Sequence, residues 1–155
     1  MIPKIESCHE IALRGILSSS TTVTKTDYEK LAAFRYELRK FLHFSEQAAK
    51  QHGLATKQYL AMLAIEGFPG RNEVTMNELS ERLQIAAHTA VELTDRLEAA
   101  GLAKRTPSTG DKRQVLVRLT RLGRSKLEKL AGLHNQELAS KGALLLKELT
   151  RILHP

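Results

Sequence analysis

Residues 101–120 read GLAKRTPSTGDKRQVLVRLT, which is the pattern of a charged β-hairpin. Leu102–Thr106 fits a strand, and the five residues that follow, Pro107–Asp111, are types that form turns. Gln114–Leu119 then alternates as a second β-strand does. Three apolar side chains share one face of this second strand: Val115, Val117 and Leu119. The segment is therefore predicted to fold as a two-stranded hairpin.

The net charge of the chain is concentrated in and just after this hairpin. Between Ala103 and Leu127 there are eight basic residues and one acid, a balance of +7 that equals the net charge of the whole chain. The basic residues are Lys104, Arg105, Lys112, Arg113, Arg118, Arg121, Arg124 and Lys126. Positive charge gathered in one short segment indicates a polyanionic partner, most naturally nucleic acid. The alternative is a solvated hairpin whose charges protect a sheet edge from aggregation.

Two short helices are predicted directly before the hairpin. Thr75–Glu78 has the capping-box pattern and begins a helix over Met76–Leu83, after a very short strand at Glu73–Thr75. A tight connection leads to a second helix, Ala87–Ala100, which Gly101 ends. Its core stripe is Ala90, Leu93, Leu97 and Ala100. Such a pair is a helix-turn-helix pattern, and with the basic hairpin it predicts a winged helix.

Longer helices are predicted before this pair. Asp27 is expected to cap a helix that continues to about Gln51 and is apolar on two faces, so that it must be covered twice. In so short a chain the second cover is expected to be another subunit, and the alternative is a central helix buried within one subunit. Thr56 is expected to cap the next helix, Lys57–Glu66.

Two further helices are predicted after the hairpin. Thr120 is expected to cap the first, which runs from Arg121 to about Ala139. Its stripe comprises Leu127, Leu130, either Leu133 or His134, and Leu138. Gly142 is expected to separate it from a last helix, Ala143–Leu153. These helices are too short to bury themselves, so they are expected to pair with the long first helix and with a second subunit.

The expected fold class is mainly α with a small β-hairpin wing, a winged helix-turn-helix flanked by dimerisation helices from both termini. Residues 1–24 are assigned to an N-terminal extension that contains a short helix. Residues 25–54 and 121–155 are assigned to a helical dimerisation region, and residues 55–120 to a winged helix-turn-helix DNA-binding lobe.

Composition agrees with this class. Apolar residues make up 42% of the chain, aromatic residues only 5%, and tryptophan is absent, which favours a helical Leu/Ala core over a β-sandwich. No apolar run approaches the roughly 20 residues that span a bilayer, and the first residues do not read as a signal peptide. The single cysteine, Cys8, cannot form an intramolecular disulfide. A cytoplasmic protein that does not bind membranes is therefore expected.

The second helix of the pair has the residue types of a helix that reads the major groove. Its candidate DNA contacts are Ala87, His88, Thr89, Val91, Glu92 and Arg96. The small first residue permits close approach of the backbone to DNA, the polar side chains are expected to face base edges, and Val91 fits a thymine methyl group. Acidic residues outnumber basic residues on this helix, so it is expected to recognise bases rather than to supply the electrostatic attraction for DNA. The alternative is an ordinary polar helix face.

The electrostatic attraction of DNA is expected to come from the basic residues of the hairpin. Lys112 or Arg113 at its tip is expected to enter a minor groove, where narrow A·T-rich segments concentrate negative potential. Asp111 is expected to orient the guanidinium of Arg113 or, less rigidly, the ammonium of Lys112. The candidate phosphate contacts on the strands are Lys104, Arg105 and Arg118.

Five segments, taken in order, resemble those of the MarR family of bacterial transcription regulators. They are Gly53–Leu63 (GLATKQYLAML), Thr75–Leu83 (TMNELSERL), Asp95–Leu102 (DRLEAAGL), Asp111–Arg113 (DKR) and Leu119–Gly123 (LTRLG). The resemblance covers about Asp27–Pro155. It implies a homodimeric regulator, expected to be a repressor, in which each subunit presents one winged helix to half of a palindromic operator. It also implies control by a small aromatic or phenolic ligand between the dimer region and the DNA-binding lobe.

The chain departs from the family pattern on the reading helix. Glu92 lies where many relatives carry a basic or small residue, and Val91 lies where threonine or serine is common. An unusual base preference, or a weak contact with DNA, is therefore expected here. The alternative to a regulator is a winged-helix module that binds protein or acts architecturally, with little base specificity.

Other chemistry has little support in the sequence. Cys8 is a candidate redox residue because it is the only thiol, although the neighbouring acids Glu6 and Glu10 do not favour a thiolate. The alternative for Cys8 is a small buried apolar residue. The six histidines show no spacing typical of a metal site. No cofactor is expected, and the absence of a phosphate loop, nucleophile elbow or paired carboxylates argues against an enzyme.

Overall fold

The computed structural model describes residues 22–108, 110 and 114–154. The expected N-terminal helix and Cys8 lie outside these residues, as do Asp111, Lys112 and Arg113 at the tip of the predicted hairpin. Within the described part of the chain, no helix has the length and the apolar character needed to cross a membrane.

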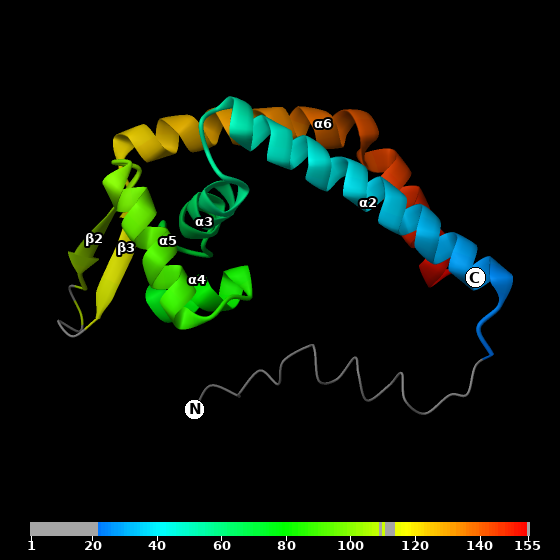
Figure 1. Cartoon of the computed structure of the whole chain (residues 1–155), viewed down its shortest axis with the longest axis horizontal. Coiled ribbons are helices and arrows are strands. Elements are labelled where there is room, and N and C mark those ends of the chain that lie inside the picture. The colour runs from blue at the N-terminus through cyan, green and yellow to red at the C-terminus, as the bar shows by residue number, and fades with distance from the viewer. Residues whose placement is uncertain (1–21, 109, 111–113, 155) are drawn as a thin grey trace.

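The described chain forms a small lobe and a long two-helix arm (Figure 1). In order, the elements are α2 (Lys25–Gln51), α3 (Thr56–Glu66), β1 (Glu73–Thr75), α4 (Met76–Leu83), α5 (Ala87–Ala99), β2 (Ala103–Pro107), β3 (Val115–Leu119) and α6 (Arg121–Leu153). The three strands form one antiparallel sheet in the order β1-β3-β2. The predicted mainly α fold with a small hairpin wing is confirmed.

The arm consists of α2 and α6, which lie side by side (Figure 1). The predicted break at Gly142 is wrong, because α6 continues unbroken from Arg121 to Leu153. A glycine inside a helix costs only about 1 kcal/mol relative to alanine, and packing along α2 can offset that cost. An ion pair between Lys141 and Glu137, with 2.7 Å between its atoms, also spans the turn before Gly142.

Two predicted helix caps are displaced by one to three residues. The N-cap of α2 is Thr24, and Asp27 is its capping-box partner, which accepts a hydrogen bond from the Thr24 amide at 2.9 Å. This bond and the one from the Thr24 hydroxyl lower the pKa of Asp27. The first residue of α3 is Thr56, and Ala55 precedes it as the N-cap, with its amide bonded to the side chain of Gln58 at 3.0 Å. In both cases the residue that reaches back lies inside the helix.

The predicted caps of α4 and α6 are confirmed. Thr75 and Glu78 form a reciprocal capping box at the start of α4. Burial raises the pKa of Glu78, but hydrogen bonds from Thr75 and the nearby Arg71 outweigh this effect and lower it overall. At the start of α6, the Thr120 hydroxyl accepts from the Gly123 amide at 3.0 Å and donates to the Gly101 carbonyl at 2.7 Å.

Gly123 permits the close contact between the start of α6 and Leu102, which lies in the link from α5 to β2. A Cβ atom at this position would lie 2.0 Å from the carbonyl oxygen of Leu102. Thr120 donates its backbone N–H to that same carbonyl at 3.0 Å. Only glycine therefore allows α6 to leave the wing at this angle, which places the arm relative to the lobe.

The core of the lobe lies between α3, α4, α5 and the inner face of the sheet. Together with Leu130 of α6, its largest fully buried side chains are Met62, Ile65, Leu79, Leu97, Leu119, Val74, Val117 and Thr94. Ala100, expected in the stripe of α5, is exposed as the C-cap, and Thr94 is buried instead. Its hydroxyl donates to the Ala90 carbonyl at 2.8 Å, so a polar side chain is tolerated there.

The hairpin strands differ slightly from their expected pattern. Strand β2 begins one residue later than predicted and ends one residue later, at Pro107. On β3, Val117 and Leu119 are buried as expected, whereas Val115, which pairs with Pro107 next to the loop that connects the strands, is 44% exposed. Leu116 points to the opposite face, which the alternating pattern predicts to be exposed, but it is buried.

His134 joins the arm to the lobe at the point where α2, α3 and α6 meet. It is the buried member of the Leu133 or His134 alternative, whereas Leu138 of the same predicted stripe is 41% exposed. Its Nδ1 lies 2.7 Å from the Leu130 carbonyl, so Nδ1 carries the proton. Its Nε2 lies within hydrogen-bond distance of the Ser45 hydroxyl, at 2.8 Å.

Three aromatic rings surround this imidazole. Tyr59 of α3 stacks on it with 4.6 Å between ring centroids, and Phe41 and Phe44 of α2 meet it edge-on at 6.0 and 5.5 Å. The same burial raises the pKa of the Tyr59 hydroxyl. Because one ring touches residues from three helices, the cluster holds the arm and the lobe together.

Replacing His134 with alanine is expected to lower the free energy of unfolding by about 2–4 kcal/mol, because it opens a cavity and leaves Ser45 without its partner. Urea unfolding at one fixed protein concentration measures the loss. The control is His88→Ala on the exposed face of α5, where a change within about 0.5 kcal/mol is expected. Equal effects of the two substitutions would contradict a joining role for His134.

Candidate nucleic-acid interface

The turn between α4 and α5 fixes the direction in which α5 leaves the lobe. Gln84 ends α4 in the left-handed conformation, with φ of 52°, and its side chain donates to the Glu81 carbonyl at 2.7 Å. Ala86 is the N-cap of α5, and no side chain caps the amides of the first turn. The positive end of α5 therefore remains available to an anion.

The structure places the predicted reading residues on one open side of α5. The exposed members of the set are Ala87, His88, Val91, Glu92 and Arg96. Thr89 is half-buried. The inner side of the helix holds Ala90, Leu93, Thr94 and Leu97 in the core. The predicted division of α5 into a core stripe and a free polar face is therefore present, apart from the exchange of Ala100 for Thr94.

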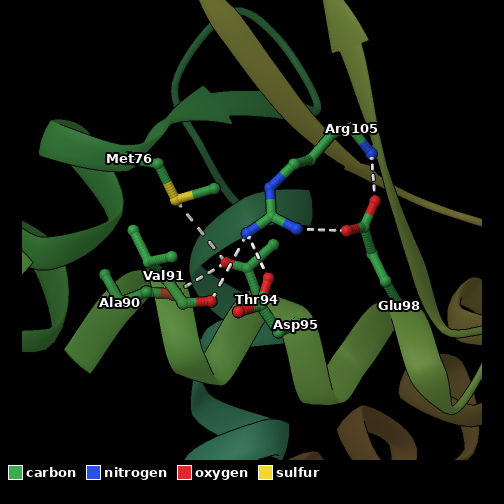
Figure 2. Close-up of polar contacts among 7 residues, drawn as sticks. All are labelled: Met76, Ala90, Val91, Thr94, Asp95, Glu98 and Arg105. Carbon is green, nitrogen blue, oxygen red and sulfur yellow. Dashed lines mark hydrogen bonds and ion pairs between the residues drawn. The ribbon is translucent and has the colours of Figure 1, made fainter. Parts of the chain in front are cut away.

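Arg105 of β2 reaches across to α5 instead of pointing away from the protein (Figure 2). Its guanidinium lies 2.7 Å from the Asp95 carboxylate and also pairs with Glu98. Its backbone N–H donates to Glu98 at 2.7 Å, and Nη2 donates to the Val91 carbonyl at 3.4 Å. We call this set of contacts the Arg105 brace, because it ties a strand of the wing to the reading helix.

The brace changes the charge of the reading helix. The sequence shows three acids on α5 against one base, which by itself would repel a polyanion. Two of those acids, Asp95 and Glu98, are paired with Arg105. Glu92 keeps only a loose ion pair with Arg96, at 3.8 Å. The net acidity presented by the outer face of α5 is therefore smaller than the sequence indicates.

Lys104 and Arg118 lie on the other face of the sheet from Arg105. They are cross-strand partners, and Glu73 of β1 stands opposite Arg118 on its other side. Lys104 is exposed, whereas Arg118 is partly covered, and its Nε is a buried atom without a hydrogen-bond partner. Of the three strand residues predicted to contact phosphates, Lys104 and Arg118 therefore lie on one face of the wing and Arg105 lies on the other.

The pairing of Arg105 with Asp95 and Glu98 was not predicted. Asp95 and Glu98 are three residues apart, so they lie on neighbouring turns of one side of α5. Arg105 follows seven residues after Glu98, just beyond the glycine that ends the helix. This spacing is a signal that could have indicated the brace. Among the described residues, no three histidine, cysteine or acidic side chains are grouped to hold a metal ion.

Replacing Arg105 with alanine is expected to lower the free energy of unfolding by about 1–2 kcal/mol, because two carboxylates and a carbonyl lose a charged donor. Denaturant unfolding measures this loss. Lys104→Ala, an adjacent and exposed cation, serves as the matched control and should change stability by less than about 0.5 kcal/mol. A double-mutant cycle with Glu98→Gln should show coupling, and strictly additive effects would mean that the brace contributes nothing.

Comparisons with known proteins agree with this geometry. Residues 52–114 match the family model described as "MarR family". A search of curated proteins gave no match. The solved structure of AbsC, a MarR family transcriptional regulator from Streptomyces coelicolor, is similar with a TM-score of 0.71 and 21% identity, over 88% of this chain and 95% of that one.

Two further solved structures are similar. A MarR family protein from Bacillus stearothermophilus has a TM-score of 0.70 and 20% identity, over 86% of this chain and 96% of its own. A C80S mutant of MarR from E. coli, complexed with operator DNA, has a TM-score of 0.59 and 25% identity, over 78% and 90%. Residues 52–114, which span the helix pair and most of the wing, thus match the MarR family model, and most of the described chain shares the winged-helix fold of solved MarR family proteins.

Proposed function

We propose that the protein is a sequence-specific regulator of transcription, a repressor that binds double-stranded DNA as a homodimer on a palindromic operator. The observation that carries the proposal is the free polar face of α5, which lies beside a basic wing on a winged-helix frame. Two similar proteins support it, since E. coli MarR has been solved with operator DNA and MepR of S. aureus with an oligodeoxyribonucleotide.

In this proposal α5 enters the major groove and the wing supplies attraction. The uncapped N-terminus of α5 meets a phosphate, and its exposed side chains meet base edges. Lys104 and Arg118 face phosphates beside the wing. The contacts expected of Asp111, Lys112 and Arg113 stay as the sequence predicts them, with the tip of the wing in a minor groove. Arg105 is already engaged by α5, so a phosphate contact would have to extend or replace the brace.

A homodimer accounts for the apolar side chains along the arm. Leu146, Leu149 and Leu153 of α6 follow one another at i, i+3 and i+7, and they are 65%, 37% and 63% exposed. Tyr28, Leu31 and Leu42 of α2 are exposed as well. Contiguous apolar side chains of this kind mark an interaction surface. A second copy of the arm would cover them and would place two α5 helices on half-sites about one DNA turn apart.

Control by a small aromatic or phenolic ligand is the part of the proposal that rests on the family resemblance. Within one chain, the junction of α2, α3 and α6 is filled by His134 and its three aromatic neighbours. Such a ligand would therefore bind outside this cluster, in the cleft that a dimer forms between the arm and the lobe.

Selection of bound fragments from genomic DNA tests the proposal. We expect enrichment of one palindromic sequence and an affinity that falls steeply as salt concentration rises. Arg113→Ala is expected to weaken binding about tenfold and to reduce the salt slope by about one, because it removes a cation expected to contact the DNA backbone or minor groove. The matched control is Lys147→Ala, which removes one exposed cation from the far end of α6 and should have little effect.

If the protein bound every fragment alike at moderate salt, sequence-specific regulation would be refuted. The alternative, an architectural or protein-binding module, would then be favoured. The acidic residue Glu92 on the reading helix is the observation that keeps this alternative worth testing.

Dimerisation is tested by substitutions on α6. Leu146→Glu places a charge at the first and most exposed position of the leucine stripe and is expected to give a monomer at micromolar concentrations. Leu144→Glu, at a position that is 46% exposed but lies off the stripe, is the control and should remain dimeric. Sedimentation velocity measures both. A monomeric parent protein at tens of micromolar would contradict the proposed dimer.

A further inference from the structure

Glu92 is the carboxylate on α5 that the protein leaves most free. Asp95 and Glu98 on the same helix are held by Arg105. Glu92 approaches a cation only at Arg96, with 3.8 Å between the charged atoms, and the two side chains are 61% and 69% exposed. An exposed i,i+4 pair of this kind contributes little to stability and breaks readily. Its carboxylate is therefore available to a partner outside the chain.

The position of Glu92 is that of a base contact. It lies on the exposed face one turn after His88 and next to Val91, which is 41% exposed. These residues belong to the first half of α5, and the first turns of a recognition helix reach the base edges in the major groove. The brace adds to this, because Arg105 bonds to the Val91 carbonyl and to Asp95 and so holds this part of α5 against the wing.

We infer that Glu92 determines specificity by accepting a hydrogen bond from the exocyclic amino group of a cytosine. The inference rests on the proposed DNA-binding function and goes beyond it, because it names the base that the acid reads. In the described chain, the role of Glu92 within the protein is confined to its loose contact with Arg96.

The chemistry of the base edges selects cytosine. A carboxylate only accepts hydrogen bonds. In the major groove guanine presents two acceptors, thymine presents one acceptor and a methyl group, and adenine places the N7 acceptor beside its amino group. Cytosine presents its amino donor without an acceptor on the same edge. A carboxylate is therefore attracted to cytosine, and the other three bases place an acceptor oxygen or nitrogen near its negative charge.

Arg96 complements this contact. It follows Glu92 by one helical turn, so both side chains leave the same side of α5. When Glu92 turns toward cytosine, the guanidinium of Arg96 is released to donate to guanine O6 and N7 of the same or a neighbouring pair. An acid and an arginine side by side would therefore favour a C·G pair, and Arg96 would offset the repulsion between Glu92 and the DNA backbone.

Selection of bound sequences from random double-stranded DNA tests this inference with four proteins. The parent protein should enrich a cytosine at one fixed position of each half-site. Glu92→Ala should bind the same overall site but tolerate every base at that position. Glu92→Gln should shift the preference toward adenine, because a glutamine amide pairs with adenine N6 and N7. Glu128→Ala removes one exposed acid from α6 and serves as the charge-matched control, so its base preferences should equal those of the parent.

A second measurement isolates the amino group itself. In the selected site, the cytosine is replaced by a pyrimidinone analogue that lacks the 4-amino group. The parent protein should lose about tenfold in affinity, within the range of a single mismatched pair, and Glu92→Ala should be insensitive to the replacement. Thermal unfolding should be unchanged in Glu92→Ala, since the side chain is exposed.

The failures of the two proposals can be told apart. Absence of any enriched sequence with the parent protein would refute the proposed function. An enriched palindrome whose base preferences are the same in the parent, Glu92→Ala and Glu92→Gln would leave that function standing and would overturn the role of Glu92. Equal affinity of the parent for cytosine and for the amino-free analogue would overturn it as well.

Discussion

The Arg105 guanidinium is the point on which the geometry of the winged-helix lobe depends. It holds two carboxylates of α5 and a backbone carbonyl of the same helix, while its own backbone belongs to a wing strand. A hairpin of two five-residue strands has little core of its own, so its angle to the reading helix must be fixed by such contacts. Gly123 completes the constraint on the other side, because its missing side chain lets α6 start against Leu102.

The second constraint lies at His134, between the lobe and the arm. One imidazole bonds to Ser45 of α2 and to the Leu130 carbonyl of α6, and it stacks on Tyr59 of α3. Any rotation of the arm against the lobe must break these bonds or move the three helices together. Under the proposed function, a ligand that changes the spacing of two reading helices would act on this junction, because it is where the angle of the arm is set.

The structural features that could be predicted from sequence are those formed between residues close together in the chain. The capping box of Thr75 and Glu78 and the cap at Thr120 follow from spacing alone, since both partners lie within one turn. The fold followed from the same patterns and from the charge of the hairpin. The continuity of α6 through Gly142 was not predictable in this way, because it reflects packing against α2, a helix about a hundred residues earlier in the chain.

The candidate site was predictable as a set of positions but not as a set of contacts. The exposed face of α5 follows from helical periodicity, so His88, Val91 and Glu92 were placed correctly on its free side. Arg105 was assigned to phosphate because a basic residue on a basic hairpin looks like part of one surface. Its side chain instead faces α5, since alternate residues of a strand point to opposite sides of the sheet. The strand register shows that Arg105 shares the face of Val117, whereas Lys104 shares the opposite face with Arg118.

Under the proposed function, the residues that attract DNA and the residues that contact its bases lie on different elements. The positive charge that draws a polyanion lies mainly in the wing and its surroundings, whereas α5 carries acids, two of which Arg105 neutralises. Because attraction does not depend on α5 being basic, that helix can keep an acid at position 92 and use its charge to reject bases that present acceptors. An acid at position 92 is compatible with DNA binding only while Arg105 stays paired with Asp95 and Glu98. Without Arg105, three carboxylates would face the DNA together, and the repulsion would no longer discriminate between bases.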